Sequence, residues 1–262
     1  MCDDPARDRA RPLPDFLIIG AQKSGTNTLY DYFAQHPDVR RSSIHEVHFF
    51  DNNFDRGVGW YRGHFPHNSG SHRRWLTGET SPYYLFHPLA PRRAARVVPG
   101  ARLVALLRNP VDRAYSHYHH TRAKGRERLS FEEALEREAE RTDDAWNDLA
   151  SGRVAEAPPV QHHSYLARGR YAEQLARWFA CYPTEQVAVV KAEDLYERPE
   201  PVMRRLFHFL DLPEYDGLAY RKLNARSYST LEPRLRVRLG DYFREPVREL
   251  ADLLGDGLWW EL

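Results

Sequence analysis

Three parts of the chain repeat one pattern, in which a short run of apolar residues precedes a segment with apolar residues at helical spacing. The apolar runs cover residues 16–19, 103–107 and 187–190. Short runs rich in branched and aromatic side chains predict buried strands, and the periodic segments after them predict helices. Strands that alternate with helices in this way form a largely parallel sheet covered on both faces. The pattern therefore predicts an α/β fold with a central, mostly parallel sheet flanked by helices.

Capping residues and prolines indicate where several of these helices begin and end. Asn109 and Pro110 suit the N-cap and the first position of the helix that follows the second strand. Pro37 ends the helix of the first unit. In the C-terminal segment, Pro246 predicts a break between two helical pieces, and Gly255 predicts a C-cap.

The most polar part of the chain is residues 121–160. Periodicity predicts a surface helix over 131–146, followed by a loop through 156–163. A solvated helix and loop is the simpler interpretation, and a flap over a substrate cleft is the alternative. Two histidine-rich stretches, HYHH at 117–120 and QHHSY at 161–165, lack carboxylate or thiolate partners at metal-site spacing, so we expect no metal site.

Composition limits the class of protein. With 262 residues, 42% of them hydrophobic, the chain can bury the core of one domain, which we expect over 15–262 after a flexible tail at 1–14. The net charge is only +1, from 38 basic and 37 acidic residues, which argues against a nucleic-acid partner. No apolar run is long enough to span a bilayer, and the first residues do not read as a leader, so we expect a cytoplasmic protein. The oligomeric state stays undetermined.

The stretch FLIIGAQKSGTNTLYDYF, residues 16–33, joins the first strand to its helix through a loop of small residues. Gly20 and Gly25 have the spacing of a Walker A element, but Thr26 stands where that element has lysine, and Lys23 lies inside the loop. Such a loop directs backbone N–H groups and the positive end of a helix dipole at an anion. We expect the anion site to consist of Lys23, Ser24, Gly25, Thr26, Asn27 and Thr28. A tight turn with an ordinary Thr or Asn cap is the alternative.

A second cation stands at the end of the second strand. Arg108 ends this apolar run, where a P-loop nucleotidase would usually have an acidic residue for Mg²⁺, and Ser116 follows about two helical turns later. An arginine at this junction repels a metal ion and suits a second phosphate. An ion pair between Arg108 and Asp112 is the alternative. Together the two strand ends predict a nucleotide with separate phosphate groups, bound without a metal.

These segments resemble motifs of the sulfotransferases that use 3′-phosphoadenosine 5′-phosphosulfate (PAPS). IIGAQKSGTNTLYDYF, 18–33, is similar to the loop that binds the 5′-phosphosulfate, and LVALLRNPVDRAYSHY, 103–118, is similar to the element that binds the 3′-phosphate. The likeness is greatest to the heparan sulfate N- and 3-O-sulfotransferases and to bacterial-type enzymes, and it covers most of residues 15–255. The resemblance implies a P-loop-like sulfotransferase fold, PAPS as the donor, and transfer of its sulfuryl group to an acceptor.

The resemblance also implies roles at the donor. Lys23 is expected to contact the bridging and leaving oxygens, with residues 24–28 on the 5′-phosphate and Arg108 and Ser116 on the 3′-phosphate. Arg226, in NARSY, matches the arginine of a loop that closes over the donor, although the Lys and Gly of that loop have no counterpart here. A transferring sulfuryl group carries less negative charge than a terminal phosphoryl group. A lysine and helix-end amides are therefore expected to stabilise it without a metal.

The segment IHEVHFFD, residues 44–51, matches the catalytic stretch of the family. This match implies that Glu46 is the general base that takes the proton of the acceptor. If the segment is extended, side-chain alternation places Glu46 and His48 on one face, and His48 is expected to orient or polarise the acceptor oxygen. Without the family context, an exposed Glu and a structural His would be the simpler interpretation.

The sequence does not identify the acceptor, which can be a glycan, a glycolipid or a small molecule with a hydroxyl or an amine. Trp60, Tyr83 and Tyr84 could stack on a sugar or aromatic acceptor, although aromatics at this spacing more often belong to the core. Thr80 stands where heparan-type enzymes often have Lys, which weakens the case for a heavily sulfated polysaccharide. Two other functions stay open at this point: a P-loop kinase for a small molecule, and a nucleotide-binding module without catalysis.

Overall fold

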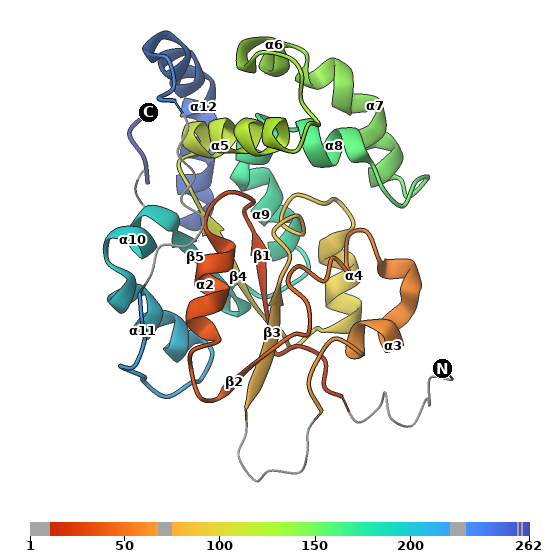
Figure 1. Cartoon of the computed structure of the whole chain (residues 1–262), viewed down its shortest axis with the longest axis vertical. Helices are drawn as coiled ribbons and strands as arrows, with labels where there is room; N and C mark the ends of the chain where they lie inside the picture. Colours follow the sequence, from red (N-terminus) through yellow and green to blue (C-terminus); the bar gives the residue numbers. More distant parts are fainter. Residues whose placement is uncertain (1–10, 68–74, 221–228, 256, 258) are drawn as a thin grey trace.

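The structure is a computed structural model that describes residues 11–67, 75–220, 229–255, 257 and 259–262. A twisted sheet forms its centre, helices cover both faces of the sheet, and a further group of helices lies across one end (Figure 1). This arrangement confirms the predicted α/β fold.

The sheet has five parallel strands in the spatial order β2-β3-β1-β4-β5. Their bounds are Phe16–Gly20 for β1, Val39–Arg41 for β2, Leu76–Thr80 for β3, Arg102–Leu107 for β4 and Val187–Lys191 for β5. The three apolar runs form β1, β4 and β5 as predicted. The hydrophobic pattern does not reveal β3, because its sequence LTGET is mostly polar although all five residues are buried.

The described residues also form eleven α-helices, most of which follow a strand or lie over the strand ends. They are α2 (Thr26–Phe33), α3 (Gly57–Arg62), α4 (Ala90–Val97), α5 (Pro110–Ala123), α6 (Phe131–Glu136), α7 (Glu138–Ala150), α8 (Pro158–His163), α9 (Tyr171–Phe179), α10 (Ala192–Glu197), α11 (Pro199–Phe209) and α12 (Pro233–Leu254).

Alternate residues of the central strands enter two separate cores. Leu17 and Ile19 of β1 belong to the core that includes residues of α4, α9 and α12. Phe16 and Ile18 belong to the opposite core, which includes residues of α2 and α11. All four side chains have no exposed surface. Burial of an aliphatic or aromatic side chain contributes roughly 1.5–3 kcal/mol, so these alternating positions fix which face of the strand meets which helices.

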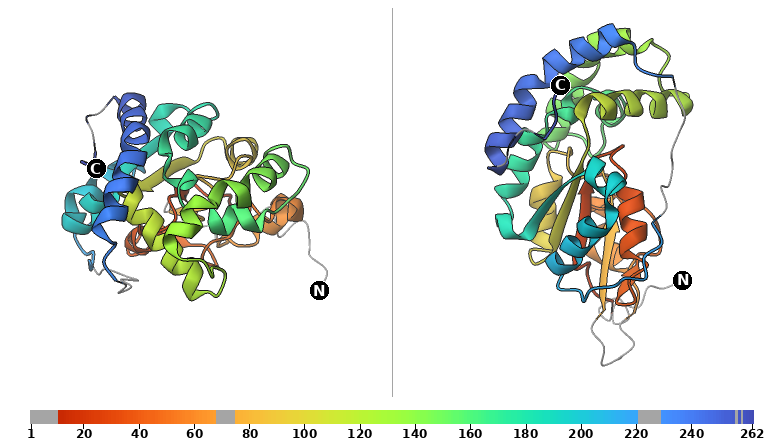
Figure 2. Two further views of the ribbon diagram at one scale, coloured as in Figure 1. Left: turned by 90° about the horizontal axis from the view of Figure 1, so that it is seen from above. Right: turned by 90° about the vertical axis from the view of Figure 1, so that its left-hand side faces the viewer.

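Helices α5 to α8 and part of α12 lie across the C-terminal ends of the strands (Figures 1 and 2). A third apolar core holds α5, α6 and α12 together, with Tyr118, Phe131 and Phe243 among its members. Ligands of open parallel sheets bind outside the carboxyl ends of the strands. This helical layer therefore covers the end of the sheet at which a ligand site is expected.

Two expectations about secondary structure are wrong. Pro246 does not divide the C-terminal segment, because α12 continues through it from Pro233 to Leu254 and ends at Gly255, which has a left-handed C-cap conformation as predicted. Buried Phe243, Val247 and Leu250 keep the helix packed on both sides of the proline, which offsets the lost backbone hydrogen bond.

The segment expected to be a loop over 156–163 contains the short helix α8, which begins with two prolines. The expected surface helix before it is present as two helices, α6 and α7.

Part of the expected N-terminal tail lies against the domain. The Arg11 guanidinium donates hydrogen bonds to the carbonyls of Gly63 and Phe65, both at 2.8 Å, and Leu13 packs on a core. The expectation for residues 1–10 falls outside the described residues. No helix in the described part of the chain has the length and apolar character needed to cross a membrane.

Candidate active site

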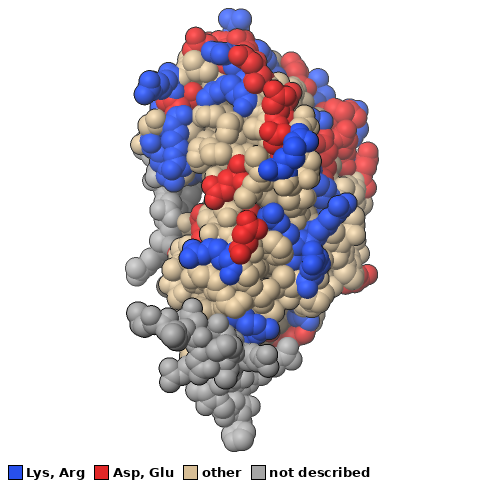
Figure 3. Space-filling view, turned by 90° about the vertical axis from the view of Figure 1, so that its right-hand side faces the viewer, with Lys and Arg blue, Asp and Glu red and all other residues tan. Residues whose placement is uncertain are grey.

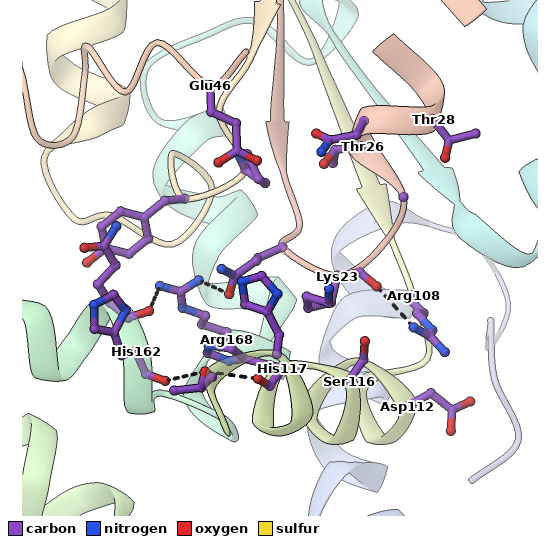
Figure 4. Close-up of a pocket in the computed structure, with 18 of the residues that line it drawn as sticks. Lys23, Thr26, Thr28, Glu46, Arg108, Asp112, Ser116, His117, His162 and Arg168 are labelled. Atoms are coloured by element: carbon purple, nitrogen blue, oxygen red, sulfur yellow. Dashed lines mark hydrogen bonds between the residues drawn. The ribbon is translucent and has the colours of Figure 1, made fainter. Parts of the chain in front are cut away.

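A cavity of about 680 Å³ lies between the carboxyl ends of the strands and the helical layer above them. Among the segments that line it are the loop after β1, the segment at 46–48, helix α5 along most of its length, and the region of α8. In the view of Figure 4, Glu46 and His162 lie toward one end, Arg108 and Ser116 lie toward the other, and Lys23 lies between them. The cavity therefore brings together most of the residues that the sequence nominated.

The loop after β1 presents its backbone to this cavity. Lys23, Gly25, Thr26, Asn27 and Thr28 all line it. Gly25 is the N-cap of α2, and no side chain caps the helix N-terminus. The alternative of a turn with an ordinary Thr or Asn cap is therefore absent, and the first N–H groups of α2 have no side-chain capping partner.

The shape of this loop depends on left-handed backbone conformations. Gly25 has φ 93° and Lys23 has φ 74°. The Tyr196 hydroxyl donates a 2.9 Å hydrogen bond to the Ser24 carbonyl, which fixes the loop from the side of α10. The Ser24 side chain is fully buried and does not line the cavity. Only glycine adopts the Gly25 conformation without strain, and this constraint sets the direction of the following N–H groups.

The second predicted cation lies beside the same loop. Arg108 donates a hydrogen bond to the Lys23 carbonyl at 3.2 Å, and both Arg108 and Ser116 line the cavity. Asp112 pairs with Arg236 at 2.6 Å rather than with Arg108, so the alternative ion pair is not formed. Asn109 caps α5 as predicted, because its side chain accepts hydrogen bonds from two backbone N–H groups of the first turn.

Glu46 and His48 meet at the cavity, but not for the expected reason. Their segment is not extended: both residues are left-handed, each with φ 53°. The two side chains still meet, because the His48 Nε2 lies 3.2 Å from a Glu46 carboxylate oxygen. The His48 Nδ1 lies 2.7 Å from a carboxylate oxygen of Asp51, whose side chain has no exposed surface. The sequence analysis did not single out Asp51.

The two carboxylates determine the charge of this histidine. Burial by itself lowers the pKa of His48, but hydrogen bonds to Asp51 and Glu46 outweigh burial and raise it to about 10. His48 is therefore an imidazolium at neutral pH and donates from both ring nitrogens. Glu46 and His48 line the cavity, whereas Asp51 does not.

The predicted aromatic residues lie in different places. Tyr83 lines the cavity, whereas Trp60 and Tyr84 do not. Tyr84 is fully buried, and Trp60 packs at the edge of a core beneath the Arg56 guanidinium. The expected acceptor contacts of Trp60 and Tyr84 therefore have no basis in their positions. Arg226 lies outside the described residues.

Arg168 is a cavity residue that the sequence analysis missed. It is 3% exposed, donates hydrogen bonds to the Gln22 side chain at 2.7 Å and the Gln161 carbonyl at 2.8 Å, and stacks on Tyr83. Burial lowers the pKa of Arg168 to about 10, which leaves the guanidinium charged at neutral pH. A single arginine before a helix carries no signal in the sequence.

Imidazole and cationic groups that were not assigned to the site also line the cavity. Burial lowers the pKa of His162 to about 4 and that of His117 well below its ordinary value, so both rings are neutral at neutral pH. The missed lining residues are Gln22, Asp112, His117, His120, Thr121, Lys124, Arg126, Gln161, His162, Arg168, Glu193 and Tyr196, with Pro82. The two histidine-rich stretches were the available signal for three of them.

In the described part of the chain, no three His, Cys, Asp or Glu side chains are grouped to hold a metal ion.

Comparison with known proteins agrees with this fold. The sulfotransferase domain family matches residues 13–229. A crystal structure of a sulfotransferase from Alicyclobacillus acidocaldarius is 32% identical, with a TM-score of 0.74 over 94% of this chain and 97% of that one. The membrane-associated sulfotransferase kil1 of Dictyostelium discoideum is 25% identical over 98% of this chain and 68% of its own length.

A human bifunctional heparan sulfate N-deacetylase/N-sulfotransferase 3 is 31% identical over 92% of this chain. The chain spans only 30% of that relative's length. The chain belongs to the sulfotransferase domain family. It is an enzyme of the PAPS-dependent sulfotransferase class.

Proposed function

We propose that this enzyme moves the sulfuryl group of PAPS to a hydroxyl or amine of a carbohydrate, glycolipid or small-molecule acceptor by direct in-line displacement. The observation that carries the proposal is the joint opening of two cationic strand ends and the Glu46–His48 pair into one cavity. The cations suit the donor, and the carboxylate suits the proton of the acceptor.

The residues present fit a nucleotide with phosphate groups at two positions. Lys23 and the N-terminus of α2 lie at the end of β1, and Arg108 with Ser116 lies at the end of β4. Arginine and a helix N-terminus are both good partners for phosphate oxygens. We assign the first group to the 5′-phosphosulfate and the second to the 3′-phosphate.

Glu46 is proposed as the general base. Its carboxylate accepts the proton as the acceptor oxygen or nitrogen forms a bond to sulfur, and the bond from sulfur to the 5′-phosphate oxygen breaks. Lys23 and the amides of α2 stabilise the negative charge that develops on the leaving phosphate. The His48 imidazolium, held by Asp51, fixes the orientation of the Glu46 carboxylate through the 3.2 Å contact.

Polar and charged groups surround the position expected for the acceptor. Glu46, His48, Tyr83, His162 and Arg168 line this part of the cavity. They offer hydrogen bonds and cationic charge, which suits a polar acceptor. A relative named for heparan sulfate N-sulfation also supports a carbohydrate acceptor.

Substitution of the proposed base tests this mechanism. Glu46→Gln keeps the size of the side chain but removes its capacity to accept a proton, so we expect kcat to fall about 100-fold or more. The affinity for 3′-phosphoadenosine 5′-phosphate (PAP) should stay close to that of the parent, since Glu46 does not belong to the donor contacts. Labelled PAPS, an acceptor panel and mass spectrometry of the sulfated product give the turnover.

Two results would contradict the proposal. Equal turnover in the parent and the Glu46→Gln variant removes Glu46 from the mechanism. Tight PAP binding by the parent without turnover on any acceptor would favour a nucleotide-binding module without catalysis.

A further inference from the structure

A buried carboxylate next to the active site has no role in the mechanism above. Glu79 lies near the end of β3 and has no exposed surface. Its carboxylate accepts hydrogen bonds from the hydroxyls of Tyr61 at 2.9 Å, Tyr84 at 2.7 Å and Ser81 at 2.6 Å. Burial raises the pKa of Glu79, and the hydroxyl donors offset only part of this rise. Burial of a carboxylate is costly, and three hydroxyl donors compensate in part for the burial of this one.

Two of these hydroxyls connect Glu79 to the backbone of the catalytic segment. Ser81 Oγ accepts a hydrogen bond from the His48 N–H at 3.0 Å. The Tyr84 oxygen accepts from the Phe49 N–H at 2.7 Å and lies 3.3 Å from the Phe50 nitrogen. A hydroxyl has one proton and two lone pairs. Because Glu79 accepts the proton, the lone pairs are left to face the N–H groups of the segment.

The segment needs such connections because its backbone is locally unfavourable. Glu46 and His48 both have φ 53°, a region that is unfavourable for non-glycine residues unless the surroundings enforce it. From the other side, the Arg93 guanidinium donates to the carbonyls of Phe50 and Asp51. The hydroxyls of Ser81 and Tyr84 hold the N–H groups, and Arg93 holds the carbonyls.

We propose that Glu79 is a positioning residue for sulfuryl transfer: through Ser81 and Tyr84 it orients the backbone that directs Glu46 and His48 at the acceptor. This inference rests on the proposed function of Glu46 and His48. Glu79 does not line the cavity and is not expected to contact either substrate. Its loss should therefore reduce turnover and leave donor binding intact.

The structure provides a matched pair of variants. Tyr84→Phe and Tyr61→Phe each remove one hydroxyl that donates to the same oxygen of Glu79. Only Tyr84 also accepts from the backbone N–H of Phe49, whereas the Tyr61 ring stacks on Phe49 and is kept by the substitution. A general loss of stability affects both variants, and loss of positioning affects only the first.

We expect Tyr84→Phe to lower kcat about tenfold or more, because it leaves a buried N–H of the catalytic segment without its partner. Tyr61→Phe should stay within about twofold of the parent, as expected where no contact made in the transition state is lost. PAP affinity should be unchanged in both. Ser81→Ala, which removes the partner of the His48 N–H, should behave like Tyr84→Phe.

An NMR readout separates this inference from the proposed function. The imidazole signals of His48, assigned through a His48→Gln variant, report its contacts whether or not the enzyme turns over. Tyr84→Phe and Ser81→Ala should shift these signals, and Tyr61→Phe should not. Unchanged His48 signals in Tyr84→Phe, or equal loss of kcat in Tyr84→Phe and Tyr61→Phe, would overturn the positioning role. Shifted signals with parental turnover would show that the hydroxyls orient His48 without any effect on sulfuryl transfer, which would also overturn the positioning role; the proposed role of Glu46 is tested separately by Glu46→Gln.

Discussion

Gly25 is subject to the most severe steric constraint in the loop after β1. Its φ is 93°, and an added Cβ would lie 2.2 Å from the Tyr196 hydroxyl oxygen. That hydroxyl is held by its hydrogen bond to the Ser24 carbonyl, so it is not free to move away. A side chain at this position must therefore distort the loop that presents its N–H groups to the cavity.

We predict that Gly25→Ala weakens PAP binding and lowers the free energy of unfolding by about 1–3 kcal/mol. Isothermal titration with PAP and urea unfolding measure the two effects. Gly125→Ala is the matched control, because Gly125 is also left-handed, with φ 70°, but an added Cβ there meets nothing within 4 Å. If the two variants behave alike, backbone strain alone accounts for the cost and the contact with Tyr196 has no importance.

At the scale of helices and strands, the sequence correctly predicted a helix end wherever a single residue determines that end. Asn109 and Gly255 cap their helices as predicted, because each acts through its own backbone conformation and immediate neighbours. Pro246 was misleading because the packing of α12 outweighs a local penalty. Strand β3 was missed because its burial depends on both neighbouring strands, β1 and β2, rather than on its own composition.

The cap of α5 allows a prediction at this scale. The Asn109 side chain accepts from the N–H groups of Val111 at 3.0 Å and Asp112 at 3.3 Å. Asn109→Ala should therefore lower the free energy of unfolding by about 1 kcal/mol. It should also weaken PAP binding, because the start of α5 positions Arg108 and Ser116.

Ser130→Ala is the control for this variant, since Ser130 caps α6 with a full capping box and does not line the cavity. Urea unfolding should show a similar loss of stability, and titration should show parental PAP affinity. Weaker PAP binding in both variants would mean that the effect is global rather than carried by α5.

At the scale of the whole molecule, charge is balanced overall and concentrated locally. The net charge is +1, and acidic and basic side chains are interspersed on the face shown in Figure 3. The cavity, in contrast, is lined by five cations, Lys23, Arg108, Lys124, Arg126 and Arg168, against three carboxylates, Glu46, Asp112 and Glu193. An anionic donor is therefore expected to be attracted by the cavity rather than by a field of the whole protein.

Buried neutral histidines make the whole molecule sensitive to acid. Burial lowers the pKa of His87 from about 6.5 to about 4, and its side chain has no exposed surface. The unfolded chain takes up a proton near pH 6.5 while folded His87 stays neutral. This contribution to stability is present above about pH 6.5 and is lost as the pH falls toward about 4.

We predict that His87→Asn, which keeps an acceptor for the Leu89 N–H, loses less stability over this pH range than the parent. Urea unfolding at several pH values between about 7 and about 4 measures the difference. The exposed His208 provides the control, and His208→Asn should follow the parent. Parallel pH profiles for all three proteins would show that His87 does not contribute to acid sensitivity.

By itself the sequence determined the α/β alternation, the two cationic strand ends, the cap of α5 and the nomination of Glu46 and His48. The first three follow from local periodicity, steric limits and neighbouring residues, and the nomination of Glu46 and His48 follows from the resemblance of residues 44–51 to the sulfotransferases. Only the tertiary structure decided that Asp51 contacts His48, that Glu79 is buried among the hydroxyls of Ser81 and Tyr84, that Arg168 lines the cavity and that Tyr84 is buried. Such contacts join residues that are distant along the chain, so their energies depend on how the sheet and its helices pack together.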